Sequence, residues 1–226
     1  MGRGGVCRVV FIVIIIIIEV NNIILNNLKK ISPSIPIVSE ETSENKNLDL
    51  NTFWLVDPID GTYDYINNRD EFTLNAGLII NKVAVAGIIY APAKKRMFYS
   101  YGNNISYELN NSNEKVLNNK NIDKNNIRAV SYSNNLKPEI IEIHKKLKVK
   151  EYLKMKSSLK FCVIATGEFH VYAAEARANE WDIAAGHAIL KNSGGTITDF
   201  DGKEIFYGKS GFKNPSTEPI PTAQAR

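Results

Sequence analysis

Short apolar runs separated by polar turns recur along the 226-residue chain and predict a protein rich in strands. Two of the longest runs are separated only by Asn81-Lys82, so the strands on either side should pair antiparallel in a meander. Residues 103–126 contain many Asn and few apolar side chains, which predicts a loop-rich excursion. The expected strands are Ile35–Val38, Phe53–Val56, Phe72–Ile80, Val83–Tyr90, Arg96–Tyr101, Ile127–Ser133, Phe169–Ala173 and, joined as a hairpin by Asp201-Gly202, Thr196–Phe200 and Glu204–Tyr207.

Helical patterns alternate with these strands in the second half of the chain. Pro138–Leu147 is amphipathic and begins with Pro, which favours the first turn of a helix. Phe161–Ala165 continues a helix that starts at Ser157-Ser158-Leu159-Lys160, and Gly194 is placed to end a helix that starts at Asp182. This alternation predicts an α/β fold.

The N-terminal run Val9–Ile18 is apolar throughout and consists almost entirely of β-branched residues. Such residues disfavour helix, so the run is expected to be a buried strand or an aggregation-prone segment. It is too short to span a bilayer, and no small-residue cleavage site follows it, which argues against export. Ile23–Leu28 followed by Lys29 and Lys30 predicts instead the last turns of a helix.

Composition adds few constraints. With 44% apolar and 23% charged residues, the chain is expected to be globular and to bury a proper core. The net charge of +4 is spread over scattered lysines rather than Arg-rich blocks, which favours small anionic ligands over nucleic acid. Cys7 and Cys162 match no metal-ligand spacing and indicate a reducing compartment.

The candidate chemistry centres on Asp57-Pro58-Ile59-Asp60-Gly61-Thr62, where two carboxylates follow an apolar strand and precede a helix start. Fixed carboxylates favour Mg²⁺, and Mg²⁺ sites of this kind hydrolyse phosphate esters. Gly61 and Thr62 add backbone N–H groups that suit a phosphate. The same pattern is also consistent with two ordinary turns that bind no metal.

Other polar groups fall at similar positions. Glu40 follows a short strand, which makes it a further carboxylate candidate or part of a solvated acidic loop. Ser158 and Lys160 at a helix start could bind a phosphate, or the serine could simply cap the helix. Asp182 begins a helix, where an acidic residue is often only a cap, and His187 inside that helix is more often a core residue than a ligand.

Ser39-Glu40-Glu41, the Asp57–Thr62 stretch and Trp181-Asp182-Ile183-Ala184-Ala185-Gly186 with Gly194-Gly195 together resemble the Mg²⁺-dependent inositol monophosphatase family. Ser157-Ser158-Leu159-Lys160-Phe161-Cys162 is most similar to its bacterial 3′(2′),5′-bisphosphate nucleotidases. The resemblance implies an alternating α/β sandwich with a mixed, largely antiparallel sheet, a second smaller sheet and an incomplete first helical layer. It also implies removal of the 3′-phosphate from 3′-phosphoadenosine 5′-phosphate.

The resemblance assigns roles by position. Gly61, Thr62, Ser158, Lys160 and Asp182 would contact the substrate, and Thr62, Asp60 and Glu40 would take part in catalysis. The Mg²⁺ ligands would be the carboxylates of Glu40, Asp57, Asp60 and Asp182 and the backbone carbonyl of Ile59.

One departure from the family pattern affects turnover. The family places a Thr-x-x-Asp-like segment some two dozen residues before the Glu-Glu pair, and its Asp helps to activate water; here that region is Ile14–Ile18. Hydrolysis is therefore expected to be impaired while binding is retained. Two alternatives remain open: an inositol or sugar monophosphatase, and a non-catalytic metal or nucleotide binder.

The resulting organisation has three parts: an atypical apolar segment over residues 1–22, a phosphatase domain over 23–215 and an unrelated tail over 216–226. We expect a cytoplasmic protein without a transmembrane span. Peripheral contact with the inner membrane and a homodimer are left open. The expected ligand is a small phosphorylated nucleotide.

Overall fold

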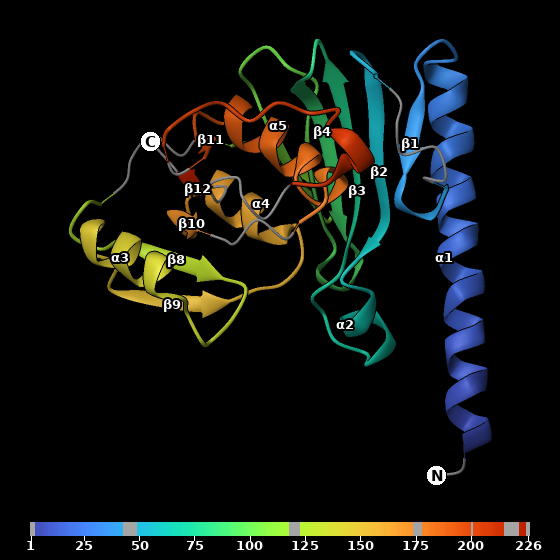
Figure 1. The fold of residues 1–226 in the computed structure, drawn as a ribbon, viewed down its shortest axis with the longest axis horizontal. Helices are drawn as coiled ribbons and strands as arrows, with labels where there is room; N and C mark the ends of the chain where they lie inside the picture. Colours follow the sequence, from blue (N-terminus) through green and yellow to red (C-terminus); the bar gives the residue numbers. More distant parts are fainter. Residues whose placement is uncertain are drawn as a thin grey trace.

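The computed structural model describes residues 3–42, 49–117, 123–173, 178–199, 201–214 and 222–224, and the side chains of residues 12–214 within those ranges. Two sheets with helices between and outside them make up this part of the chain (Figure 1). The α/β layered architecture expected from the sequence is confirmed.

The larger sheet contains seven strands among the described residues, in the order β1-β2-β3-β4-β5-β6-β7. β1 is parallel to β2, and each later pair is antiparallel. Asn81 and Lys82 both have positive φ, as a tight two-residue hairpin turn requires, so the expected meander is confirmed. The strands are β1 Ile37–Ser39, β2 Phe53–Asp60, β3 Thr73–Ile80, β4 Val83–Ala91, β5 Arg96–Ser100, β6 Tyr107–Asn110 and β7 Asn113–Val116.

The loop predicted over residues 103–126 is wrong in its first half, because β6 and β7 form a hairpin there. Asn111 and Ser112 both take positive φ at the turn. Polar residues in β6 and β7 interrupt the alternation of apolar and polar positions that marks a strand in the sequence. Glu108 is one of them: it is buried, and ion pairs with Arg96 and Lys115 stabilise it. Residues 118–122 of the predicted loop lie outside the described residues.

The smaller sheet follows the order β11-β12-β10-β8-β9 in the described part of the chain. β8 is parallel to β9 and β10, while β12 is antiparallel to β10 and β11. The expected hairpin is reduced to one bridge between Thr198 and Glu204, and Phe200 lies outside the described residues. The strands are β8 Arg128–Ser131, β9 Glu151–Lys154, β10 Val171–Ala173, β11 Thr196–Thr198 and β12 Thr222–Gln224. β12 falls within the stretch predicted as an unrelated tail, although the domain boundaries themselves stay a prediction.

Two buried helices lie between the sheets (Figure 1). α5 approaches β3 and β4 closely because Gly77 and Gly87 lack side chains; a Cβ at Gly87 would lie 2.5 Å from the Ala185 carbonyl oxygen. The remaining helices are shorter or peripheral. The α-helices other than the N-terminal one are α2 Thr62–Ile66, α3 Pro138–Lys146, α4 Leu159–Ala165 and α5 Ala184–Asn192; the 3₁₀ turns are η1 Glu40–Thr42, η2 Pro92–Lys94, η3 Glu180–Asp182 and η4 Ser210–Phe212.

The predicted strand over Val9–Ile18 is wrong, because helix α1 runs from Arg3 to Ile31. One side of α1 packs on the body through Val13, Ile17 and Leu28. β-Branched residues cost only up to about 0.7 kcal/mol each in a helix. Burying an Ile side chain contributes about 1.5–3 kcal/mol, so at Val13 and Ile17 tertiary packing outweighs the local preference of those residues.

The predicted helix end after Leu28 is confirmed, with Lys29 and Lys30 in the last turn. Ile12–Ile31 is long and apolar enough to cross a membrane by length and composition alone, the one such segment in the described ranges. The same test is passed by core helices, and part of this helix is packed against the sheet.

Candidate functional site

The end of β2 forms the base of the candidate site. The pairing of β2 with β3 is interrupted between Asp57 and Asp60, where Pro58 has no N–H to donate. Asp57 Oδ1 accepts a hydrogen bond from the Ile59 backbone N–H at 3.0 Å, which holds this bulge. Gly61 follows with φ +92°, and a Cβ there would lie 2.6 Å from the Glu71 carbonyl oxygen. Only glycine allows this turn, which starts α2 at Thr62.

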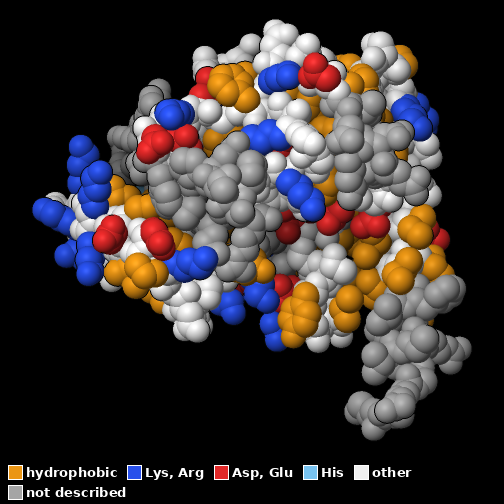
Figure 2. All heavy atoms as spheres, in the orientation of Figure 1, with side chains coloured by type: hydrophobic (Ala, Val, Ile, Leu, Met, Phe, Trp, Pro, Cys, Tyr) orange, Lys and Arg blue, Asp and Glu red, His pale blue; other side chains and the backbone are white. Residues whose placement is uncertain are grey.

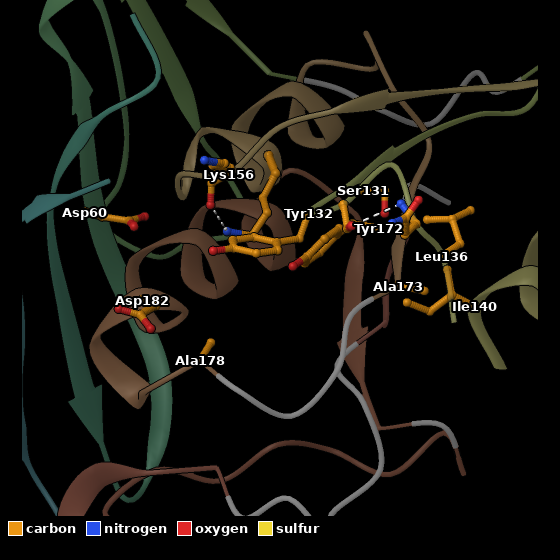
Figure 3. A pocket seen from close by; sticks show the side chains of 13 residues that line it. Asp60, Ser131, Tyr132, Leu136, Ile140, Lys156, Tyr172, Ala173, Ala178 and Asp182 are labelled. Carbon is orange, nitrogen blue, oxygen red and sulfur yellow. Dashed lines mark hydrogen bonds between the residues drawn. The ribbon is translucent and has the colours of Figure 1, made fainter. Parts of the chain in front are cut away.

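The structure brings Glu40, Asp57, Asp60 and Asp182 into one cluster. Glu40 begins η1 directly after β1, and Asp182 is the last residue of η3. Figure 3 shows Asp60 and Asp182. Burial, followed by repulsion from the other three carboxylates, raises the pKa of Asp57 well above its usual value. Burial and the charge of Asp60 raise the pKa of Asp182 to about 7. Burial also raises the pKa of Glu40, which shares a hydrogen bond with Asp57. That bond requires one of the two carboxyl groups to be protonated.

The four side chains are carboxylates, whose oxygen atoms are the ligands that hard divalent cations prefer. Crowded, desolvated carboxylates that must share a proton are stabilised when a cation replaces that proton. Within the described ranges, no group of three or more His, Cys, Asp or Glu side chains is arranged to hold a metal ion as it stands. One oxygen of each of Asp57, Asp60 and Asp182 accepts a hydrogen bond. The residues therefore fit Mg²⁺ as donors.

Ser158 lies beneath these carboxylates rather than along the cavity wall. Its hydroxyl lies 2.5 Å from Asp60 Oδ2 and 2.8 Å from the Asp182 carbonyl oxygen, and its backbone N–H also donates to Asp60 Oδ2. Asn75 Nδ2 donates to the Ser158 hydroxyl at 3.1 Å. Ser158 was expected to face a nucleotide; the buried contacts with Asn75 and Asp60 turn it toward the acidic cluster.

A cavity of about 240 Å³ opens beside Asp60 and Asp182 (Figure 3). Lys160 lies in its wall and is nearly buried, with Nζ donating to the carbonyl oxygens of Lys156 and Ser157 at 3.2 and 3.0 Å. Burial lowers the pKa of Lys160, while the nearby Asp60 and Asp182 charges oppose that effect. The lining residues are Asp60, Ser131, Tyr132, Ser133, Asn135, Leu136, Ile140, Lys156, Lys160, Tyr172, Ala173, Ala178 and Asp182.

The cavity thus joins three kinds of surface. Carboxylates lie at one end, Lys156 and Lys160 line the wall, and Tyr132 with Leu136 and Ile140 provides an aromatic and apolar end. This arrangement can hold an organic phosphate: the anion lies near the lysines, and a flat apolar group contacts the other end. His187 does not take part, because it is buried against the hydroxyl of Tyr207.

Sequence reasoning missed Asn75, Lys156, Tyr132 and Tyr172. Asn75 had a readable signal, since it is a polar residue that points inward within an apolar strand. The two tyrosines come from β8 and β10 neighbourhoods that only the tertiary fold brings together.

The segment that lacks the expected Asp lies close to the site. Ile17 of α1 is buried against Val13 and Ile59, with Tyr65, Ile66 and Phe72 around them. Thr62 donates its hydroxyl to the Ile59 carbonyl oxygen at 3.1 Å. An apolar side chain therefore packs where α1 approaches the loop from Ile59 to Thr62.

Comparisons with known proteins agree on the family. The inositol monophosphatase family model matches residues 13–224. A 3′(2′),5′-bisphosphate nucleotidase CysQ of Buchnera aphidicola is 37% identical over 193 residues, covering 84% of this chain and 72% of that protein. The CysQ of Escherichia coli K12 is 30% identical over 213 residues, covering 88% and 80%. The crystal structure of CysQ from Bacteroides thetaiotaomicron has a TM-score of 0.71 at 29% identity, covering 85% of this chain and 77% of that one. This chain belongs to the inositol monophosphatase family.

Proposed function

We propose that the chain is a Mg²⁺-dependent phosphomonoesterase of the 3′(2′),5′-bisphosphate nucleotidase type, which removes the 3′-phosphate of 3′-phosphoadenosine 5′-phosphate. The observation that carries the proposal is the buried carboxylate cluster at one end of a cavity whose wall contains Lys156 and Lys160. The CysQ names of its relatives favour the nucleotide over other phosphate esters. We also propose a cytoplasmic location, where such small nucleotides are found.

Glu40, Asp57, Asp60 and Asp182 would hold Mg²⁺, with the Ile59 carbonyl oxygen as a further ligand. When bound, Mg²⁺ lowers the pKa of a water molecule and offsets charge on the leaving oxygen. The chain itself supplies the crowding that makes binding favourable, since the charges that raise the pKa of Asp57 would be neutralised.

Gly61 and Thr62 would hold the scissile phosphate through backbone N–H groups at the start of α2. Lys160 would contact a second phosphate by a charge-assisted hydrogen bond. Its ammonium group lies over the rings of Phe161 and Tyr172, at 5.1 and 5.4 Å from their centres, which restricts its position. Tyr132 would face the nucleoside at the apolar end of the cavity.

Ser158 and Asn75 would act as positioning residues. Ser158 offers two donors to Asp60 Oδ2, which leaves Oδ1 of that carboxylate for the metal. Asn75 donates to the Ser158 hydroxyl and so orients its proton toward an acceptor on the acidic side.

Ile17 favours a second candidate function, a metal and nucleotide binder with little turnover. A hydrocarbon beside the loop from Ile59 to Thr62 cannot accept a proton from water. General-base assistance is worth about 10²- to 10⁴-fold in rate, so its loss would separate binding from hydrolysis.

The test is phosphate release from a panel that contains a 3′,5′-bisphosphorylated nucleotide, the 5′-monophosphate, inositol monophosphate and a sugar bisphosphate, each with and without Mg²⁺. Calorimetry with the same ligands measures binding independently. Preferential, Mg²⁺-dependent hydrolysis of the bisphosphorylated nucleotide supports the proposal. Preference for inositol or sugar phosphates would contradict it, and nucleotide binding without any turnover would select the non-catalytic binder.

A further inference from the structure

Lys156 lies in the wall of the cavity, and its ammonium group is held against helix α2. Its Nζ is 3.6 Å from Oδ2 of Asp64, a buried residue of that helix. The same ammonium group lies over the ring of Tyr63, 4.9 Å from the ring centre. A long, flexible side chain is thus fixed at two points, which keeps its charge beside the cavity instead of in solvent.

The contacts of Lys156 leave its hydrogen-bond donors free. At 3.6 Å, the contact with Asp64 is an ion pair but too long for a hydrogen bond, and Asp64 instead accepts one from Arg69. Within the part of the chain that the structure describes, Lys156 Nζ makes no hydrogen bond, although an ammonium group carries three donors. Lys160 differs, because its Nζ already donates to two carbonyl oxygens.

Lys156 lies at the acidic end of the cavity. Asp64 is in the first turn of α2, two residues after Thr62, and Asp60 lines the same cavity. Figure 3 shows Lys156 well away from Leu136, at the apolar end. Figure 2 shows Lys and Arg side chains at the position of α2, below a group of acidic side chains. The free donors are therefore close to the place where we propose that the phosphate to be removed is bound.

We propose that Lys156 is a further phosphate-binding residue, which donates hydrogen bonds to the phosphate that is removed, and that Asp64 is its positioning residue. The inference rests on the proposed function, because it requires a phosphate ester between the carboxylates and the start of α2. The two lysines then have different roles: Lys156 contacts the phosphate that leaves, and Lys160 contacts the second phosphate.

The charges around the cavity give Lys156 a physical reason to be held in place. The carboxylates of Asp60 and Asp182 would repel an anionic substrate, and a cation in the same wall offsets part of that repulsion. Because the ion pair with Asp64 and the ring of Tyr63 already restrict the ammonium group, it loses less conformational freedom when a phosphate binds.

The test is calorimetry in Mg²⁺ with two ligands. A nucleoside 3′-monophosphate carries only the phosphate to be removed, and the 3′,5′-bisphosphorylated nucleotide carries both. Lys156→Met should weaken binding of both ligands by the same factor, about 10- to 100-fold for one charge-assisted hydrogen bond. Lys160→Ala should weaken binding of the bisphosphorylated nucleotide more. Lys156→Gln is the second variant if Lys156→Met does not fold, and Lys154→Met on β9 is the matched control, since this exposed lysine lies outside the cavity and should bind both ligands as the wild type does.

A double-mutant cycle tests the role of Asp64. Asp64→Asn removes the ion pair and should weaken binding of both ligands, by a smaller factor than Lys156→Met. Added to Lys156→Met, it should cause no further loss, because the ammonium group that it positions is already absent. If Asp64 served only the structure of α2, the two losses would multiply.

The wild-type measurement separates this inference from the proposed function. If the wild-type chain binds inositol or sugar phosphates in place of the nucleotide, the proposed substrate is wrong, and the same loss in Lys156→Met is expected with those esters. If the wild type binds the 3′-monophosphate and the Lys156 variants bind it equally well, the inference is wrong while the proposed function stands. An equal loss in Lys154→Met would also overturn it, since it would indicate only long-range charge. A wild-type chain that binds no phosphate ester would overturn both.

Discussion

Replacing Ile17 by Asp tests the link between helix α1 and turnover. Ile17 is 7% exposed and packs against Ile59, whose carbonyl oxygen accepts a hydrogen bond from the Thr62 hydroxyl. A carboxylate at this point of α1 would lie near the loop that we propose to hold metal and phosphate. There it could orient Thr62 and accept a proton from water.

The Ile17→Asp change should lower the activation free energy of hydrolysis and also lower the stability of the fold. A positioned base contributes about 10²- to 10⁴-fold in rate, which corresponds to roughly 2.7–5.4 kcal/mol of activation free energy. Losing the burial of Ile17 costs about 1.5–3 kcal/mol of folding free energy, and desolvating the new carboxylate adds to that cost. Bound Mg²⁺ would offset part of it. We therefore expect turnover per folded molecule to rise by about 100-fold or more, together with a lower melting temperature.

The assay is phosphate release from the bisphosphorylated nucleotide, normalised to the folded fraction measured by circular dichroism. Ile18→Asp is the matched control, because Ile18 is the next residue on α1 and is 47% exposed; it should leave turnover unchanged. Ile17→Asn separates the effect of charge from that of polarity and should gain little. An Ile17→Asp protein that folds and binds Mg²⁺ without faster hydrolysis would refute the reasoning, as would a wild-type chain as active as its CysQ relatives.

Three further predictions concern the acidic cluster and the cavity. Asp57→Asn should raise the melting temperature in EDTA at neutral pH, because Asn avoids the cost that burial and the neighbouring carboxylates impose on Asp57, as its raised pKa shows; the rise should be about 2–4 °C per kcal/mol of that cost. The variant should also lose stabilisation by Mg²⁺, and an unchanged Mg²⁺ response in thermal melts would exclude Asp57 as a ligand. Ser158→Ala should weaken Mg²⁺ binding by about 10- to 100-fold in calorimetry, whereas Ser157→Ala should not; equal losses would indicate only a packing role. Lys160→Ala should weaken binding of the bisphosphorylated nucleotide more than that of the monophosphate. Because burial lowers the Lys160 pKa and only its charged form attracts phosphate, wild-type affinity should fall as pH rises through that lowered pKa, and the variant should lack this fall.

Local chemistry was sufficient to predict much of the site. The turn after β2 requires positive φ, which favours glycine at position 61. Asp57 and Asp60 follow an apolar run, so their placement at the end of a strand could be predicted from their neighbours in the sequence. The Asn81-Lys82 turn likewise indicated the β3–β4 hairpin. In each case, the signal and the structure it specifies lie within a few residues of one another.

The tertiary structure decided what depends on distant partners. Ile14–Ile18 has the local preference of a strand, but it is helical because Val13 and Ile17 find an apolar surface at Ile59. Ser158 turns toward Asp60 because Asn75, 83 residues away in the chain, packs against it. Burial and hydrogen bonding between residues far apart in the chain outweigh local preferences of less than about 1 kcal/mol per residue, and a single sequence does not show which partners will meet.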